Sequence, residues 1–263
     1  MEDAVETKLI DLHNHTEKST SGFWHTIEHS PIEAVKQAKE INLDGIAITD
    51  HNTLKGLDEA LNAAEKYGII VIPGVEISAK DIFTPHPRHV IALGINPEIT
   101  QEQNIPKNQS IEKVIKWIHD QGALAIAAHP FNPEVSRFKQ EPFSLNKRLL
   151  EKHSDKIDAI ETMNLLGNNF PAQYWAKKNN IPQLGSSDSH HLKQIGLVTT
   201  KIFGSVKNWQ DIIKAIKYGQ TEPFMRASLE ILHENSYPNI VFKPKFQEKF
   251  PNLSQIFYSY NKN

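Results

Sequence analysis

The sequence contains no cysteine among its 263 residues. This absence excludes disulfide bonds, thiolate zinc sites and a cysteine nucleophile, so any bound metal ion must be held by imidazole and carboxylate groups. The chain also lacks an apolar run long enough to cross a membrane. Its first residues, MEDAVETK, are acidic and lack the apolar stretch of a secretory signal. We therefore expect a cytoplasmic protein with no membrane segment.

An excess of charge of one sign is also missing, because the formal net charge is only −2. No global basic field would attract nucleic acid or an anionic membrane. Internal repeats and low-complexity linkers are absent from the sequence, so nothing divides residues 1–220 into separate domains. Histidine, in contrast, is abundant, with 13 residues.

Short β-branched segments alternate with amphipathic segments along residues 1–220, a pattern that indicates βα units around a mostly parallel sheet. A single α/β barrel of about 250 residues suits a chain of this length. Residues 221–263 contain four prolines and a basic run, and we expect them to form a C-terminal tail that packs on the barrel or extends from it. The predicted strands are Leu9–Leu12, Gly45–Thr49, Ile69–Ile72, Val90–Leu93, Ala123–Ala127, Ala159–Thr162, Gln183–Gly185 and Leu197–Ile202.

Four predicted helices have clear terminal signals. The first opens with S-P-I-E, in which Ser30 caps the helix and Glu33 completes a capping box. Helical spacing places four apolar side chains on one face of this helix, Ile32, Val35, Ala38 and Ile41. The other three helices are expected to end at glycine caps, with the second spanning Leu54 to about Tyr67, the third Ile111 to about Gln121, and the last ending at Gly219.

Imidazole or carboxylate groups occur at the end of nearly every predicted strand, in the segments D-L-H-N-H, T-D-H-N, G-V-E-I-S, A-A-H-P, I-E-T-M-N and S-S-D-S-H. The carboxyl ends of the strands of a closed barrel converge on one face, where such folds build their active sites. We therefore expect a shared site formed by His13, His15, His51, Glu76, His129, Asp188 and His190. His119, His153 and His233 fall elsewhere in the pattern and are assigned no function.

The fourth predicted strand differs because His89 lies at its beginning rather than at its end. The connection from Glu76 to His89 contains two prolines and is too short for a crossover helix. We therefore predict that this strand returns antiparallel and brings His89 back beside Glu76. His86, which is flanked by Pro85 and Pro87, is the competing candidate from the same loop.

Seven segments together resemble the polymerase-and-histidinol-phosphatase (PHP) family of metal-dependent phosphoesterases. They are D-L-H-N-H-T, I-T-D-H-N, G-V-E-I-S, H-V-I-A-L-G, A-A-H-P, S-S-D-S-H and A-I-K-Y-G, which span roughly residues 8 to 220 in order. The resemblance implies a distorted seven-stranded (β/α) barrel of TIM-like type. It also implies two or three divalent ions, either zinc, manganese or iron, at the carboxyl ends of the strands.

The resemblance also implies a role for individual residues. One ion would be held by His13, His15, Glu76 and Asp188. The second would be held by His51 and His190, and the third by Glu76, His89 and His129, so that Glu76 bridges two ions. Asp11 and Asp50 match residues expected to orient the ligands from behind.

One position departs from the family pattern, which often has an aspartate in H-x-H-S-x-x-S-D-G that helps to bind the second ion. This chain has Thr20 there. Either the second ion is weakly held or a nearby residue substitutes for the aspartate, the candidates being Glu17, His25, Glu28 and His29.

The implied chemistry is hydrolysis of a small phosphomonoester or short phosphodiester by a metal-bound hydroxide, with Asp188, His190 and Glu76 nearby. Arg88, Arg137 and Asn164 are candidates for contacts with the phosphate, although residues of these types are more often ordinary surface groups. Two alternatives remain at this point. The protein could be a metallohydrolase of a carboxylic ester or amide, or a metal-binding module without catalysis. A polymerase-associated role is disfavoured because the chain has no room for a polymerase.

Overall fold

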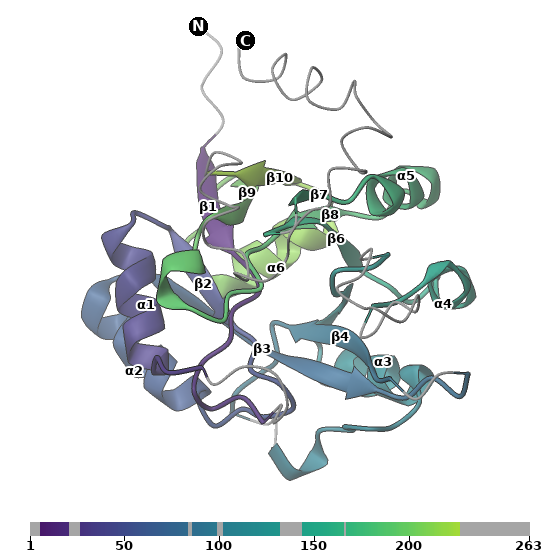
Figure 1. Ribbon diagram of the computed structural model, residues 1–263. Helices are drawn as coiled ribbons and strands as arrows, with labels where there is room; N and C mark the ends of the chain where they lie inside the picture. Colours follow the sequence, from purple (N-terminus) through teal and green to yellow (C-terminus); the bar gives the residue numbers. More distant parts are fainter. Residues whose placement is uncertain are drawn as a thin grey trace, which may run out of the picture.

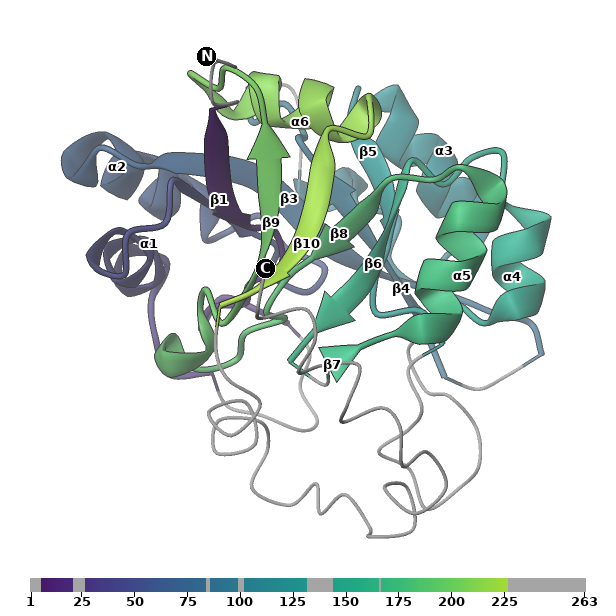
Figure 2. The same cartoon turned by 90° about the horizontal axis from the view of Figure 1, so that it is seen from above.

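The computed structural model describes residues 6–20, 27–83, 86–98, 102–131, 144–165 and 167–226. In these residues the strands form one strongly curved sheet with helices on its outer side, as two perpendicular views show (Figures 1 and 2). The strands are β1 (Thr7–Asp11), β2 (Gly45–Ile48), β3 (Ile70–Ala79), β4 (Arg88–Leu93), β5 (Leu124–Ala127), β6 (Ala159–Asn164), β7 (Gly167–Asn168), β8 (Gln183–Gly185), β9 (Val198–Phe203) and β10 (Thr221–Met225).

Helices α1 and α2 lie on one side of the curved sheet and α4 and α5 on the opposite side (Figure 1). Helix α6 packs instead with a second cluster of buried residues from β1, β3, β4 and β9. Two short 3₁₀ turns, η1 (Glu102–Asn104) and η2 (Leu192–Gln194), lie in connecting loops. The helices are α1 (Pro31–Glu40), α2 (Leu57–Tyr67), α3 (Ile111–Asp120), α4 (Lys147–Lys152), α5 (Phe170–Asn179) and α6 (Trp209–Lys217).

The strand order is β10-β9-β1-β2-β3-β4-β5-β6-β7, and β8 also pairs with β6. The hydroxyl of Thr200 on β9 joins the two ends of this order, because it accepts from the Gly185 amide at 3.0 Å and donates to the Gly185 carbonyl at 2.7 Å. A Cβ at Gly185 would lie 2.5 Å from the carbonyl oxygen of Thr199, so this approach requires glycine. The sheet is thus a nearly closed barrel, and the predicted α/β barrel is confirmed.

The described strands number ten rather than the seven that the resemblance implied. Two of them, β7 and β10, were not predicted, nor were helices α4 and α5. The strand β7 has only two residues and α4 only six, too few to show a period in the sequence. Residues 221–225 form β10, which pairs antiparallel with β9 and extends the sheet beyond the predicted barrel boundary at residue 220.

The strand β3 was predicted to end at Ile72 but continues to Ala79. Its first half pairs in parallel with β2, and its second half pairs antiparallel with β4, from Gly74 opposite Leu93 to Ala79 opposite Arg88. This pairing confirms the predicted antiparallel return of the fourth strand. The extension through Pro73 and Gly74 reflects tertiary pairing that overrides the local turn preference of these two residues.

Helix α1 begins at Pro31 with the predicted capping box between Ser30 and Glu33. Val35 and Ala38 are buried as expected, but Ile32 is 42% exposed and Ala34 is buried in its place. The prediction for Ile32 was wrong because the buried face of the helix starts at Pro31 and continues at helical spacing through Ala34, Val35 and Ala38. Helix α2 begins at Leu57, three residues later than predicted, after a turn at residues 55–56.

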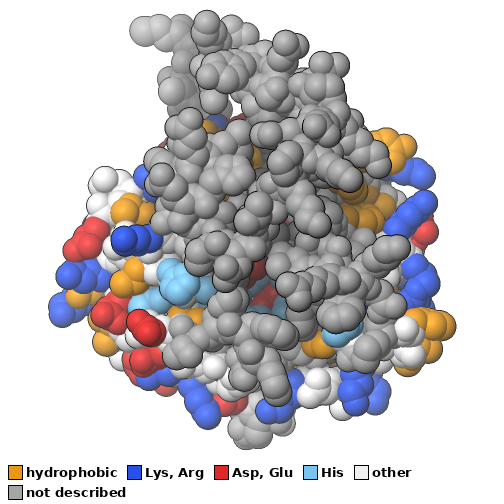
Figure 3. Space-filling view, viewed as in Figure 1, with side chains coloured by type: hydrophobic (Ala, Val, Ile, Leu, Met, Phe, Trp, Pro, Cys, Tyr) orange, Lys and Arg blue, Asp and Glu red, His pale blue; other side chains and the backbone are white. Residues whose placement is uncertain are grey.

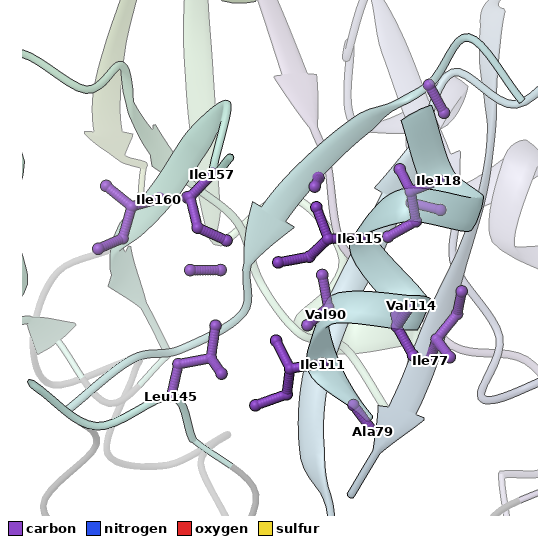
Figure 4. Packing of buried hydrophobic residues seen from close by; sticks show 14 of the residues in the cluster. Ile77, Ala79, Val90, Ile111, Val114, Ile115, Ile118, Leu145, Ile157 and Ile160 are labelled. Atoms are coloured by element: carbon purple, nitrogen blue, oxygen red, sulfur yellow. The ribbon is translucent and has the colours of Figure 1, made fainter. Parts of the chain in front are cut away.

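The largest part of the core lies between α3 and the strands β3 to β5 (Figure 4). Ile111, Val114, Ile115 and Ile118 form one face of α3 and pack against side chains such as Ile77 and Val90. This packing supports β3 and β4 from the side that faces away from the candidate site. It therefore keeps the two strands that carry Glu76 and His89 in a rigid hairpin.

Candidate metal centre

The carboxylate of Glu76 lies at the middle of a cluster of five imidazoles and is completely buried. Its Oε1 atom is 3.0 Å from His89 Nδ1, 3.2 Å from His129 Nε2 and 3.5 Å from His13 Nε2. Its Oε2 atom is 2.8 Å from His51 Nδ1 and 3.4 Å from His15 Nε2. One carboxylate thus presents each of its oxygens to a different group of rings.

Asp188 supplies the second carboxylate of the cluster. Its Oδ1 atom is 3.2 Å from His15 Nε2, 3.4 Å from His13 Nε2 and 3.8 Å from His190 Nδ1. Asp188 has φ of 51° and His129 has φ of 29°, both in the left-handed region that non-glycine residues rarely adopt. Backbone strain at two residues of one cluster is typical of a functional site that the surrounding fold holds in place.

The backbone explains how residues from distant parts of the chain meet. His13 and His15 follow β1, where Asn14 forms an isolated bridge with Ser189 and so brings the segment next to Asp188. His51 follows β2 and forms a bridge with Glu76. His89 lies opposite Ser78 in the β3–β4 hairpin, two residues beyond Glu76. All eight predicted ligands therefore lie together, whereas His86 is exposed at the turn of the hairpin.

Three groups of these side chains place their ligand atoms within 4.8 Å of one another. They are His15, His51 and His190; His13, His15 and Glu76; and His51, Glu76 and His89. The rings of His15 and His51 stack at 4.2 Å between centroids, and His15 and His190 lie 4.6 Å apart. Histidine side chains are visible on the face of the molecule shown in Figure 3.

The donor atoms of this cluster fit bound cations. His51 Nδ1 and Glu76 Oε2 are buried and lie 2.8 Å apart, but the geometry of this contact is not that of a hydrogen bond, and neither atom has another hydrogen-bond partner among the described residues. His13 Nε2 and His15 Nε2 lie only 3.0 Å apart. Lone pairs that converge in this way repel one another unless a proton or a cation lies between them, and imidazole with carboxylate is a donor set suited to zinc, manganese or iron.

The charge states follow from burial and from the neighbouring groups. Burial and the nearby rings lower the pKa of His15 well below its usual value, and burial also lowers the pKa values of His89 and His190. Burial opposes ionisation of Glu76 and Asp188, but the surrounding imidazoles outweigh it and hold both carboxyl pKa values well below normal. The neighbouring carboxylates outweigh burial at His13 and His129 and raise the pKa values of these two rings. Metal ligation requires neutral imidazoles beside ionised carboxylates, so ion binding would displace protons from His13 and His129.

A further buried carboxylate, Glu161 on β6, lies behind the cluster. Its Oε1 atom is 2.9 Å from His13 Nδ1 and accepts a hydrogen bond from the Ser186 hydroxyl. Its Oε2 atom accepts from the backbone amide of His129 at 2.6 Å. Glu161 belongs to the segment I-E-T-M-N at a predicted strand end, but no role in the site was predicted for it. The signal that could have identified Glu161 is a carboxylate near the end of a predicted strand, the position that the other candidate ligands share.

Asp11 and Asp50 bind the loops that carry the imidazoles rather than the rings themselves. Asp11 accepts from the amides of Ser187 at 3.0 Å and Gly196 at 2.8 Å. Asp50 accepts from the amide of Thr16 at 2.6 Å and from the hydroxyls of Thr16 and Ser19. Burial raises the pKa of each of these two carboxyls to about 6.

The Thr20 side chain is exposed, and its hydroxyl donates to the carbonyl of His51 at 2.7 Å. Of the residues considered as substitutes, Glu17 and Glu28 are exposed, and His25 lies outside the described residues. His29 is buried, and its Nε2 has no hydrogen-bond partner among the described residues.

The predicted phosphate contacts fall in different surroundings. Arg88 is buried, donates to the carbonyl of Ser144 at 2.8 Å and lies 3.6 Å from Asp81. Asn164 is half-buried at the end of β6, and Arg137 lies outside the described residues.

In the part of the chain that the structure describes, no helix has the length and apolar character needed to span a bilayer.

The barrel and the histidine–carboxylate cluster at its strand ends define a metal-dependent hydrolase. A family model for the PHP domain matches residues 11–176, and a PHP-associated model matches residues 167–221. The chain therefore belongs to the PHP domain family, as its sequence motifs predicted.

Individual proteins are similar to this chain in sequence or in fold. An uncharacterized protein of Methanocaldococcus jannaschii is 32% identical over 160 residues, which cover 59% of this chain and 80% of that protein. A 5′-3′ exoribonuclease of Haemophilus influenzae is 42% identical over 133 residues, which cover 46% of each chain. A two-domain Bacteroides vulgatus protein containing a PHP-like metal-dependent phosphoesterase has a similar structure, with a TM-score of 0.67 and 21% identity over 89% of this chain and 71% of that chain.

Proposed function

We propose that the protein hydrolyses a small phosphomonoester or a short phosphodiester, and that the phosphate belongs to a nucleotide or a short nucleic acid. The single observation that carries this proposal is Glu76, whose two buried oxygens face five imidazoles. Membership of the PHP family supports phosphoester hydrolysis. The similarity to an exoribonuclease, over less than half the length of that protein, supports a nucleotide phosphate.

The proposed ligand sets use each oxygen of the central carboxylate. One ion would be held by His13, His15, Glu76 and Asp188. A second would be held by His51 and His190, and a third by Glu76, His89 and His129. When bound, divalent zinc, manganese or iron ions would supply a nucleophile at neutral pH and neutralise charge on the phosphoryl oxygens.

The protein's own groups prepare this centre in three ways. Glu161 holds the proton of His13 on Nδ1, which leaves Nε2 free to face Asp188 and Glu76. Asp11 and Asp50 fix the loops that carry Asp188 and His15 through backbone amides. Burial keeps His15 and His190 neutral, because it lowers their pKa values.

Substitution of Glu76 and of a nearby control histidine tests the proposal. Glu76→Gln keeps the size of the side chain but removes its charge, so we expect hydrolysis of a 3′,5′-nucleoside bisphosphate or a short oligoribonucleotide to fall more than about a hundredfold, beyond the usual effect of outer partners. His86→Ala alters an exposed turn and should retain activity. The rates are compared at matched metal content, and equal losses in the two variants would reject the assignment.

A further inference from the structure

The turn of the β3–β4 hairpin exposes two large apolar side chains close to the candidate metal centre. Ile82 is 88% exposed and Phe83 is 69% exposed. The strands that end in this turn carry Glu76 and His89. From Ser78, which lies opposite His89, the chain reaches Phe83 in five residues, or at most about 16 Å.

Several contacts hold Phe83 in one position despite its exposure. The Asp81 carboxylate accepts a hydrogen bond from the Phe83 amide at 3.2 Å. Both oxygens of Asp81 also accept from the Arg148 guanidinium at 2.9 Å. The guanidinium carbon of Arg148 lies 4.3 Å from the centre of the Phe83 ring. One face of the ring is therefore covered by a cation that a buried carboxylate fixes in place, while much of the ring remains exposed to solvent.

The same contacts connect this turn to the metal centre. Asp81 lies 3.6 Å from Arg88, and Arg88 donates to the carbonyl of Ser144 at 2.8 Å. The hydroxyl of Ser144 lies 3.4 Å from His129 Nδ1. Since Arg88 and Asp81 are both buried, the exposed ring stands on a rigid base that is continuous with the ligand shell.

We propose that Phe83 and Arg148 form a stacking platform for a base of a short single-stranded nucleic acid whose phosphoester lies at the metal centre. This inference rests on the function proposed above and names its substrate class. A fixed aromatic ring beside an arginine is suited to base stacking, which does not depend on the identity of the base. Arg148 and Arg88 share the single carboxylate of Asp81, so this group of three side chains keeps one net positive charge, which favours a polyanion.

The size of the patch argues against a second protein chain as its occupant. A stable protein interface buries about 800 Å² on each partner, far more than two side chains at a hairpin turn can supply. The sequence as a whole has a formal charge of −2 and showed no nucleic-acid signal. The platform brings together residues 81–83 and Arg148, which lie far apart in the sequence. The overall composition therefore cannot reveal it.

The test measures binding of the metal-loaded protein to a short phosphorothioate oligonucleotide that contains 2-aminopurine and resists hydrolysis. Stacking on Phe83 should quench the fluorescence of this base. We expect Phe83→Ala to weaken binding about tenfold and to abolish the quenching. Phe83→Trp should restore both, and Tyr218→Ala, which removes another exposed aromatic ring outside the described metal centre, should bind as the parent protein does.

A substrate without a base separates this proposal from the proposed function. Hydrolysis of bis(p-nitrophenyl) phosphate should be the same in Phe83→Ala and in the parent protein, while KM for a cleavable oligonucleotide rises in the variant. Unchanged oligonucleotide binding in Phe83→Ala would overturn the platform. If the variant instead loses self-association or binding to lipid vesicles while it still binds the oligonucleotide, the patch has another occupant and the proposal is also overturned. Failure of the parent protein to hydrolyse any phosphoester would overturn the proposed function, and the fluorescence measurement would still decide whether Phe83 stacks on a base.

Discussion

The position of one proton on His13 decides which of its nitrogens faces the cluster. Glu161 lies 2.9 Å from Nδ1, so the proton is held there and the Nε2 lone pair points toward Asp188 and His15. In the metal-free site the neighbouring carboxylates outweigh the burial of His13 and raise its pKa well above normal, so an ion that binds Nε2 must displace a proton from it. Glu161 therefore acts as a positioning residue, through His13 and through the amide of His129.

The substitution Glu161→Gln tests this positioning role. The amide retains the size of the side chain but loses the charge that stabilises the proton on Nδ1. We expect metal affinity to fall between about tenfold and a hundredfold, as for other partners of metal-ligating histidines. Metal titration in an isothermal calorimeter measures the affinity. The control is Glu112→Gln, which changes an exposed carboxylate that pairs with Lys152. Equal affinity in the two variants would remove Glu161 from the site.

A substitution at Thr20 tests whether a negative charge beside His15, His51 and His190 strengthens metal binding there. The three rings contribute none, and the Thr20 hydroxyl is engaged with the backbone of His51. We expect Thr20→Asp to tighten the most weakly bound ion by a few-fold to about tenfold, a modest gain because residue 20 is exposed. Titration of Thr20→Asp against Thr20→Asn isolates the charge, and unchanged or weaker binding would indicate that another residue already completes the site.

Among the elements, β3 has the largest influence on the site because it pairs in two directions. Its parallel half fixes His51 beside Glu76, and its antiparallel half brings back His89. A Cβ at Gly74, where the two halves meet, would lie 2.9 Å from Thr49 and 3.0 Å from the carbonyl of Ala92. The close spacing of β2, β3 and β4 at this point depends on that glycine.

Helix α4 contributes a pH-sensitive residue outside the metal centre. His153 ends this helix, is buried and has no hydrogen-bond partner for either ring nitrogen among the described residues. Burial lowers its pKa, so below the unfolded value of about 6.5 the unfolded chain binds a proton that the folded chain resists. The stability that depends on neutral His153 is therefore present above that pH and is lost as the pH falls.

We accordingly expect the metal-free protein to lose less stability on acidification when His153 is replaced by leucine. Urea unfolding at about pH 7 and about pH 5 in chelator measures the free energy of unfolding. His86→Leu, which changes an exposed histidine, serves as the control and should follow the parent protein. A parallel loss of stability in His153→Leu and the parent protein would contradict the assigned role.

The residues of the candidate metal centre come from strand ends around most of the barrel. The ligands follow or lie within β1, β2, β3, β4, β5 and β8 and its loop, so bound ions would cross-link most of the sheet. A ligand that binds only the folded state at about a thousand times its dissociation constant stabilises that state by about 4 kcal/mol. Metal binding should therefore stabilise the entire fold.

Chelation should lower Tm by about 10 °C and abolish phosphoester hydrolysis, and zinc or manganese should restore both. Differential scanning calorimetry with and without metal measures the shift, and elemental analysis gives the number of ions per chain. A Tm that does not change on chelation, together with full activity in chelator, would contradict a metal-dependent centre.

Much of this architecture follows from patterns that are local in the sequence. The capping box at Ser30, the glycine that ends α2 and the motifs after β1 and β2 each depend on residues within a few positions of one another. Such patterns predicted the barrel class and placed His13, His15 and His51 at strand ends, since residue type and spacing are sufficient for that step.

The class of fold, the antiparallel return of β4 and the chemical identity of the candidate ligands were thus predictable from residue types and their spacing. The contacts between residues far apart in the chain became known from the three-dimensional structure. Glu161 meets His13 across 148 positions, and Arg148 meets Asp81 across 67. Neither pair has a local signature, because each depends on the twist and closure of the whole sheet, which bring separate strand ends and the hairpin turn within hydrogen-bonding distance.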